Sequence, residues 1–259
     1  MNRLRLIALL AGVCALAAPL ASRADDATYT TIKGQVILPN PPAPAPVNVT
    51  ADPAHCLAKG PLVSDEVIVD KKTNGLKNVV VWLRPDSDDR KAKFPQDKIN
   101  PALAKVAPKN HVIDQPCCQF VPRIVAARAG DTLEVKNSAP VAHNINTEAG
   151  AIGNVGMQAN TNIKAPKPLE ASATPIPFAC NIHPWMKGQA RVFDHPYFAV
   201  TDAEGKFEIK DAPAGKFRVV YWHEGGFHKG REGILGETIE VKGTTLELKP
   251  LSFVFPPKL

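Results

Sequence analysis

Residues 178–188 read FACNIHPWMKG, and within them Cys180, His183 and Met186 follow one another at intervals of three residues. Such spacing could place the three side chains along one face of a helix. Pro184 argues against that, because proline lacks a backbone N–H and clashes with the preceding helical turn. We therefore expect a tight loop at the end of a strand, and loops on a rigid scaffold commonly carry binding sites.

A second stretch, AGDTLEVKNSAPVAHNINT at residues 129–147, predicts a Gly-Asp turn, an alternating strand, a turn and then a histidine at the start of another strand. Blue-copper sites use two histidines and a cysteine in a trigonal plane, with methionine as a weak axial ligand. A structural zinc site favours cysteine and histidine without methionine, so copper is the preferred metal. The candidate ligands are His143, Cys180, His183 and Met186.

The stretches CNIHPWMKG and GDTLEVKNSAPVAHNI resemble the cupredoxin family, in its amicyanin-like and plastocyanin-like forms, over about residues 109–193. The short C-x2-H-x2-M loop is similar to that of amicyanin-type members, and so to secreted copper proteins of bacterial methylamine utilisation. The resemblance implies a Greek-key β-sandwich that binds one mononuclear copper, Cu(I) or Cu(II), through the four candidate ligands. It also implies transfer of single electrons between redox partner proteins.

The resemblance also implies roles for residues beside the ligands. Asn144 follows the first histidine, where cupredoxins often hold the ligand loop by hydrogen bonds. The loop histidine of cupredoxins commonly exposes its ring edge, so His183 is expected to do so, with Pro184 and Trp185 forming an apolar docking surface around it. Transient redox encounters need only such small interfaces. The alternative is that Trp185 packs inward as part of the core.

The C-terminal stretch VTDAEGKFEIKDAPAGKFRVVYWHEG, residues 200–225, has two turn signals between alternating strands. It resembles carboxypeptidase regulatory-like and transthyretin-like β-sandwich modules. Such modules also contain a G-x-V strand and a strand like NVVVWL, and both occur nearer the N-terminus, at Gly34–Val36 and Asn78–Leu83. We therefore expect an all-β protein with a cupredoxin sandwich inserted into a second, smaller sandwich. The expected boundaries are 30–95 and 196–259 for the smaller sandwich and 96–195 for the copper-binding domain.

The alternative organisation has two sequential domains, with the N-terminal strands extending the cupredoxin. In either case we expect no helix after the N-terminal leader, an extended connector at the proline-dense residues 39–48, and mainly loop over residues 151–175. The expected strands are 31–38, 78–83, 123–127, 132–137, 143–146, 176–180, 188–193, 197–201, 206–209, 217–222, 237–241 and 245–248.

Residues 1–24 predict a secretory signal peptide, since Arg3 and Arg5 precede an apolar run and Ala24 suits cleavage. We expect a periplasmic protein, and no second long apolar run predicts a membrane span in the mature chain. The signal contains three arginines and no acidic residue, so its removal lowers the formal charge from +6 to +3. That charge gives no indication of nucleic-acid binding.

Four cysteines remain after the signal, and a copper-binding Cys180 must stay an unpaired thiolate. Only one disulfide is then possible among Cys56, Cys117 and Cys118. We prefer Cys56–Cys118, because strand alternation puts Cys118 on the apolar face with Phe120, whereas Cys117 shares the polar face. This bond would join the two sandwiches.

We find no nucleophile elbow or phosphate-binding loop and therefore expect a protein without enzymatic activity. The stretch HEGGFH, residues 223–228, lacks the spacing that puts two zinc-binding histidines on one helix face. Two alternatives to electron transfer remain: a copper carrier or sensor without electron-transfer turnover, and a scaffold or adhesion module with a vestigial copper loop.

Overall fold

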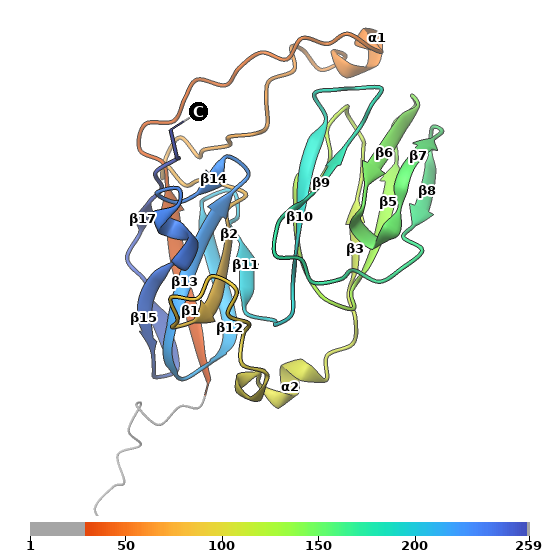
Figure 1. The fold of residues 1–259 in the computed structure, drawn as a ribbon. Helices are drawn as coiled ribbons and strands as arrows, with labels where there is room; N and C mark the ends of the chain where they lie inside the picture. Colours follow the sequence, from red (N-terminus) through yellow and green to blue (C-terminus); the bar gives the residue numbers. More distant parts are fainter. Residues whose placement is uncertain (1–28, 258–259) are drawn as a thin grey trace, which may run out of the picture.

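A computed structural model describes residues 29–257 of the protein (Figure 1). The predicted signal peptide lies outside the described residues. The described chain is nearly all β, with seventeen strands and only short helical turns. None of the helices within residues 29–257 has the length and apolar character needed to cross a membrane.

Strands from both ends of the described chain build one sandwich, here called the outer sandwich. In it β1 pairs antiparallel with β12, and β2 pairs antiparallel with β13. Its first sheet contains β12 (Lys206–Pro213), β1 (Tyr29–Ile37), β16 (Thr245–Glu247) and β17 (Leu251–Ser252). Its second sheet contains β11 (Phe198–Val200), β2 (Val80–Pro85), β13 (Gly215–His223), β14 (Gly226–Phe227) and β15 (Glu237–Val241).

The segment between β2 and β11 builds a second sandwich, here called the inner sandwich, which stands beside the outer one (Figure 1). Its five-stranded sheet runs β4 (Ile124–Arg128), β10 (Lys187–Phe193), β9 (Ile176–Ala179), β6 (His143–Thr147) and β7 (Gly153–Met157). Its three-stranded sheet runs β3 (Asn110–Ile113), β5 (Thr132–Asn137) and β8 (Thr161–Lys164).

Apolar residues form three layers between these sheets. Along β2, Val81 and Leu83 face the core of the outer sandwich, while Val80 and Trp82 face the inner sandwich. Successive side chains of a strand point to opposite faces, so a strand buried on both faces needs an unbroken apolar run. This explains the sequence VVVWL. The middle layer is the interface between the sandwiches, and Phe193 of β10 contributes to it from the other side.

All twelve strands expected from the sequence form, with ends shifted by a few residues. Residues 151–175 are mainly loop, as expected, but they also contain β7 and β8, which the sequence analysis missed. Each is a half-exposed strand at the edge of its sheet and carries few large apolar residues. Backbone hydrogen bonds pair β7 with β6 and β8 with β5. Such pairing requires no pattern of apolar side chains, so the sequence does not reveal it. The sequence analysis also missed β3, β14 and β17 and two four-residue helices, α1 (Pro53–Cys56) and α2 (Pro101–Ala104).

Residues 39–66 form a long strap. It leaves the outer sandwich after β1, carries α1 over the top of the inner sandwich, and returns toward β2 (Figure 1). As expected from its prolines, residues 39–48 are free of regular strand apart from a single bridge between Pro46 and Val63. The likeness of the outer sandwich to carboxypeptidase regulatory-like modules stays a prediction.

Candidate metal centre

The end of the inner sandwich beneath the strap brings the predicted ligand loop and the first histidine together. His143 is the first residue of β6, and Cys180 directly follows β9. The loop after Cys180 is short and closed by its own backbone, since Met186 N–H donates to His183 O at 2.8 Å and Cys180 N–H donates to Met186 O at 3.1 Å. The proline therefore sits in a tight turn, as its sequence position predicts.

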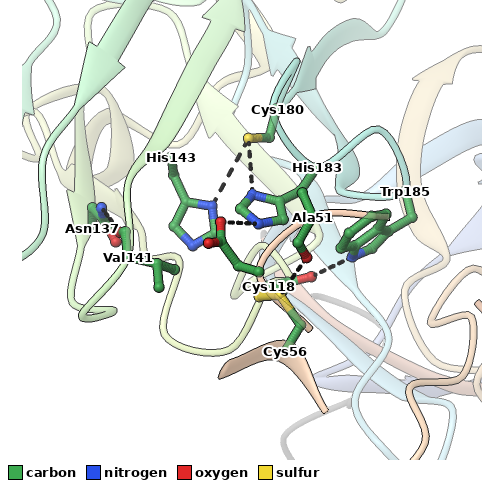
Figure 2. Close-up of a disulfide and its surroundings, with 10 residues drawn as sticks. Ala51, Cys56, Cys118, Asn137, Val141, His143, Cys180, His183 and Trp185 are labelled. Atoms are coloured by element: carbon green, nitrogen blue, oxygen red, sulfur yellow. Dashed lines mark hydrogen bonds and ion pairs between the residues drawn. A yellow bond between two sulfur atoms is a disulfide. The ribbon is translucent and has the colours of Figure 1, made fainter. Parts of the chain in front are cut away.

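Three of the four predicted ligand groups converge (Figure 2). The Cys180 Sγ atom lies 3.9 Å from His143 Nδ1 and 3.7 Å from His183 Nδ1. One donor atom from each of these three residues lies within 4.8 Å of the others. Each of the three side chains is at most 1% exposed. Met186 is equally buried and packs in the core of the inner sandwich.

The spacing of the three donor atoms fits a single first-row metal ion. Metal–nitrogen bonds of about 2.0 Å and metal–sulfur bonds of about 2.3 Å, at an angle near 120°, would separate the sulfur from each nitrogen by about 3.7 Å. The two observed separations, 3.7 and 3.9 Å, match that value. Nitrogen and thiolate donors also suit copper or zinc better than a hard cation.

Burial keeps both histidines in the form that binds metal. Loss of water lowers the pKa of His143 to about 4, and the neighbouring His183 ring adds to the effect. Burial also lowers the pKa of His183, against the opposing attraction of Asp52. Both rings are therefore neutral at pH 7, and a neutral imidazole nitrogen is the ligand species.

Asn144 ties the ligand loop to β6. Its Oδ1 accepts hydrogen bonds from the backbone N–H groups of Asn181 at 2.6 Å and Ile182 at 3.3 Å. Its own backbone N–H donates to the Cys180 sulfur at 3.4 Å. These contacts are of the kind that the resemblance implies for Asn144. They orient Cys180 and its loop through a residue that is not itself a candidate metal ligand.

The expectation that His183 exposes its ring edge is wrong. The strap covers the ring, which is fully buried, and Asp52 Oδ2 lies 3.1 Å from its Nε2, although the pair lacks hydrogen-bond geometry. The sulfur atoms of Cys56 and Cys118 also lie within 4.8 Å of a His183 ring nitrogen. The cover comes from the outer sandwich, which the cupredoxin motifs do not include. In the sequence, only the predicted Cys56–Cys118 disulfide indicates that Asp52, four residues before Cys56, lies near the inner sandwich.

The preferred disulfide between Cys56 and Cys118 forms, with Cα atoms 5.5 Å apart (Figure 2), although residues 116–119 form a turn and not the strand from which the preference was argued. Cys117 and Cys180 are free thiols. The disulfide joins α1 of the strap to the inner sandwich across a sequence separation of 62 residues. It therefore holds the cover over the metal-ligand cluster.

Trp185 takes a position between the two predicted alternatives. Its side chain is half-buried, its indole N–H donates to Cys118 O at 3.1 Å, and its ring meets the His183 ring edge-on at 5.2 Å (Figure 2). Pro184 is exposed. Both residues line a cleft of about 520 Å³ whose opposite wall is the strap, including Val63. Pro184 and Trp185 thus face a cleft, and their role as a docking surface stays a prediction.

The HEGGFH histidines do not join the ligand cluster. His223 ends β13 and His228 follows β14, so both belong to a hairpin and not to a helix. Each Nδ1 accepts a backbone N–H at 3.1 Å, from Gly225 and Val254 respectively. Both rings therefore have structural roles, as expected from their spacing.

Solved structures similar to this chain include a reduced amicyanin mutant, at 23% identity and a TM-score of 0.28, covering 35% of this chain and 88% of that chain. They also include the Cu(I) form of another amicyanin mutant, at 23% identity and 0.28, covering 37% and 92%. A purple cupredoxin from Nitrosopumilus maritimus matches at 20% identity and 0.27, covering 31% and 97%. No family model and no curated protein matches the sequence.

Proposed function

We propose that this protein binds one copper ion and passes single electrons between redox partner proteins in the periplasm, without catalysing a reaction of its own. The observation that carries the proposal is the approach of the Cys180 sulfur to the Nδ1 atoms of His143 and His183, at the separation a shared metal requires. Met186, at the end of the same loop, would supply a fourth, weakly bound sulfur ligand. Bound copper would supply a one-electron couple.

The chain's own contribution is to hold the ligands still. Asn144 and the backbone bonds of the loop constrain Cys180 and His183 from two directions. The surrounding core of the inner sandwich excludes water from all three donors. A site whose ligands hardly move on a change of charge has a small reorganisation cost, which favours fast electron transfer.

Electrons would enter or leave beside Trp185 and Pro184. This part of the proposal is supported by the edge-on contact between Trp185 and the His183 ring, and by the partial exposure of the indole. The strap blocks the direct approach to His183, so a partner would meet the cleft formed by the strap and the ligand loop. Transient redox partners need only a small contact area.

The alternative of a copper carrier or sensor needs a site that exchanges metal. Three donors that are at most 1% exposed, under a cover held by a disulfide, favour retention over exchange. The alternative of a scaffold with a vestigial loop predicts no copper binding at all.

Copper reconstitution followed by absorption and electron paramagnetic resonance spectra tests the proposal. We expect an intense blue thiolate-to-copper band that Cys180→Ser abolishes with the β fold retained, whereas the matched control Cys117→Ser keeps it. Met186→Leu should keep copper, because a thioether binds it weakly, and should raise the reduction potential, because the site becomes more apolar. A full band in Cys180→Ser would refute the ligand assignment. Transfer of copper to an acceptor without redox cycling would favour the carrier or sensor. Absence of copper binding would favour the scaffold.

A further inference from the structure

A second cleft, of about 520 Å³, opens where the two sandwiches meet, at the end of β10 that is opposite to the ligand loop. One wall comes from β2 of the outer sandwich, with Trp82, and the other from the end of β10, with Arg191 and Phe193. Residues 90–94, which follow β2, and residues 171–173, which precede β9, complete it.

Arg191 is a buried cation without a counter-ion. Its side chain is only 8% exposed, and its guanidinium carbon lies 5.1 Å from the Trp82 ring centre and 5.6 Å from that of Phe193. Nη1 donates to Ala173 O at 2.7 Å, but Nε is buried without a hydrogen-bond partner. Within residues 29–257 no carboxylate forms an ion pair with it. Buried charges are normally paired, because removal from water costs several kcal/mol.

The groups around Arg191 increase the positive charge. Five cationic side chains line the cleft and Asp194 is the one carboxylate there. Asp86 and Asp88, which come just before the lining segment, are paired with Arg218 instead. The ring of His195 is neutral, since burial lowers its pKa to about 3. The cationic residues are Arg84, Arg90, Lys91, Lys93 and Arg191.

These cations differ in burial and in the partners that hold them. Arg84 is buried, and its guanidinium donates to the backbone carbonyl oxygens of Ser87, Asp89 and Leu235, so it is fixed. Arg90, Lys91 and Lys93 are exposed, and none of their side chains forms an ion pair within the described chain. Arg191 is therefore a buried cation in a cleft that also carries three exposed, unpaired cations, and such a set of charges suits an anion.

We propose that this cleft binds a small oxyanion with more than one negative charge, of the phosphate type, with Arg191 as its buried anchor and Arg90, Lys91 and Lys93 as its outer contacts. The planar guanidinium matches the oxygen spacing of such an anion and forms charge-assisted hydrogen bonds with it. The anion would supply the missing counter-charge and would contact both sandwiches. The proposal does not depend on copper at the ligand loop.

Titration calorimetry with inorganic phosphate, at an ionic strength held constant with sodium chloride, tests this site on the purified full chain. We expect saturable binding of one phosphate. Lys91→Ala with Lys93→Ala should weaken it about tenfold, equivalent to about 1.4 kcal/mol. The matched control, Lys206→Ala with Lys210→Ala, removes the same charge from exposed positions on β12 and should bind as the parent does. Arg191→Met should abolish binding.

Two results would overturn the proposal. One is the absence of saturable phosphate binding by the parent chain, which would leave Arg191 as a packing group stacked on Trp82 and Phe193. The other is equal weakening in both double variants, which would show only a general effect of net charge. If Arg191→Met fails to fold, the comparison between the double variants still decides, because their four lysines are exposed and their removal leaves the core intact.

Discussion

Removal of the disulfide by Cys56→Ala with Cys118→Ala tests whether the strap is a fixed cover of the candidate metal centre. The bond closes a loop across a separation of 62 residues. In the chain-entropy model, closing a loop of that length lowers the entropy of the unfolded chain and so stabilises the folded protein by about 4 kcal/mol. We therefore expect the free energy of unfolding to fall by about this amount, measured as a shift of the denaturant midpoint.

The same variant should loosen the strap before it unfolds the sandwiches. Without the disulfide, the strap keeps the packing of Val49 against the core of the inner sandwich, an ion pair between Asp65 and Arg123, and a marginal hydrogen bond of 3.5 Å from Gln119 Nε2 to Val63 O. Both polar contacts lie several residues beyond α1, so the segment over His183 loses its covalent tie to the inner sandwich. The amide protons of α1 and the residue after it, which bond to backbone oxygens of the strap itself, should then exchange faster with solvent.

Hydrogen exchange, followed peptide by peptide, and the rate at which ferricyanide oxidises the reduced copper protein are the two assays. Both rates should rise, because His183 becomes accessible. Cys117→Ser is the matched control, since Cys117 is a half-buried free thiol in the same segment and should change neither rate. A stability loss below about 1 kcal/mol would refute the chain-entropy estimate. Unchanged exchange in α1 would show that the disulfide does not hold the cover.

Three further predictions concern single side chains. Trp185→Ala should cost about 2 kcal/mol, roughly half the value for a fully buried aromatic, and should slow electron exchange with a redox partner; an unchanged rate with a normal copper spectrum would remove Trp185 from the electron path. His195 has a pKa lowered to about 3 by burial, so only the unfolded chain takes up its proton below about pH 6.5, and stability falls by about 1.4 kcal/mol per pH unit from there toward pH 3. The asparagine of His195→Asn can still accept the hydrogen bond that Tyr197 N–H donates to the ring Nδ1 at 3.1 Å. Between pH 6.5 and pH 5 this variant should lose about 2 kcal/mol less of its unfolding free energy than the parent does. Equal pH dependence of unfolding in the two proteins would contradict this. Asn144→Ala leaves two loop N–H groups without their acceptor, so we expect a loss of about 1 to 3 kcal/mol and faster copper release to a chelator; an unchanged release rate would show that the loop holds itself.

The parts of this molecule that the sequence alone determined are those encoded by neighbours in the chain. The spacing of Cys180, His183 and Met186 lies within one short loop, so their association needed no knowledge of distant contacts. The runs VVVWL and VVYW mark β2 and β13, because a strand buried on both faces must be apolar at every position. The preference for Cys118 over Cys117 gave the right pair, but residues 116–119 form a turn, so strand alternation does not explain it.

Tertiary structure decided what covers the site and what remains unpaired. The strap reaches His183 from the other sandwich, so burial of the ring depends on residues about 130 positions away that carry no pattern of their own. The edge strands β7 and β8 form because β6 and β5 offer backbone groups to them, and such pairing is independent of side-chain sequence. From the sequence alone, Arg191 would be taken for an ordinary surface residue. It becomes a buried cation because two sandwiches meet around it, and only the packing of distant segments could reveal that its charge has no partner.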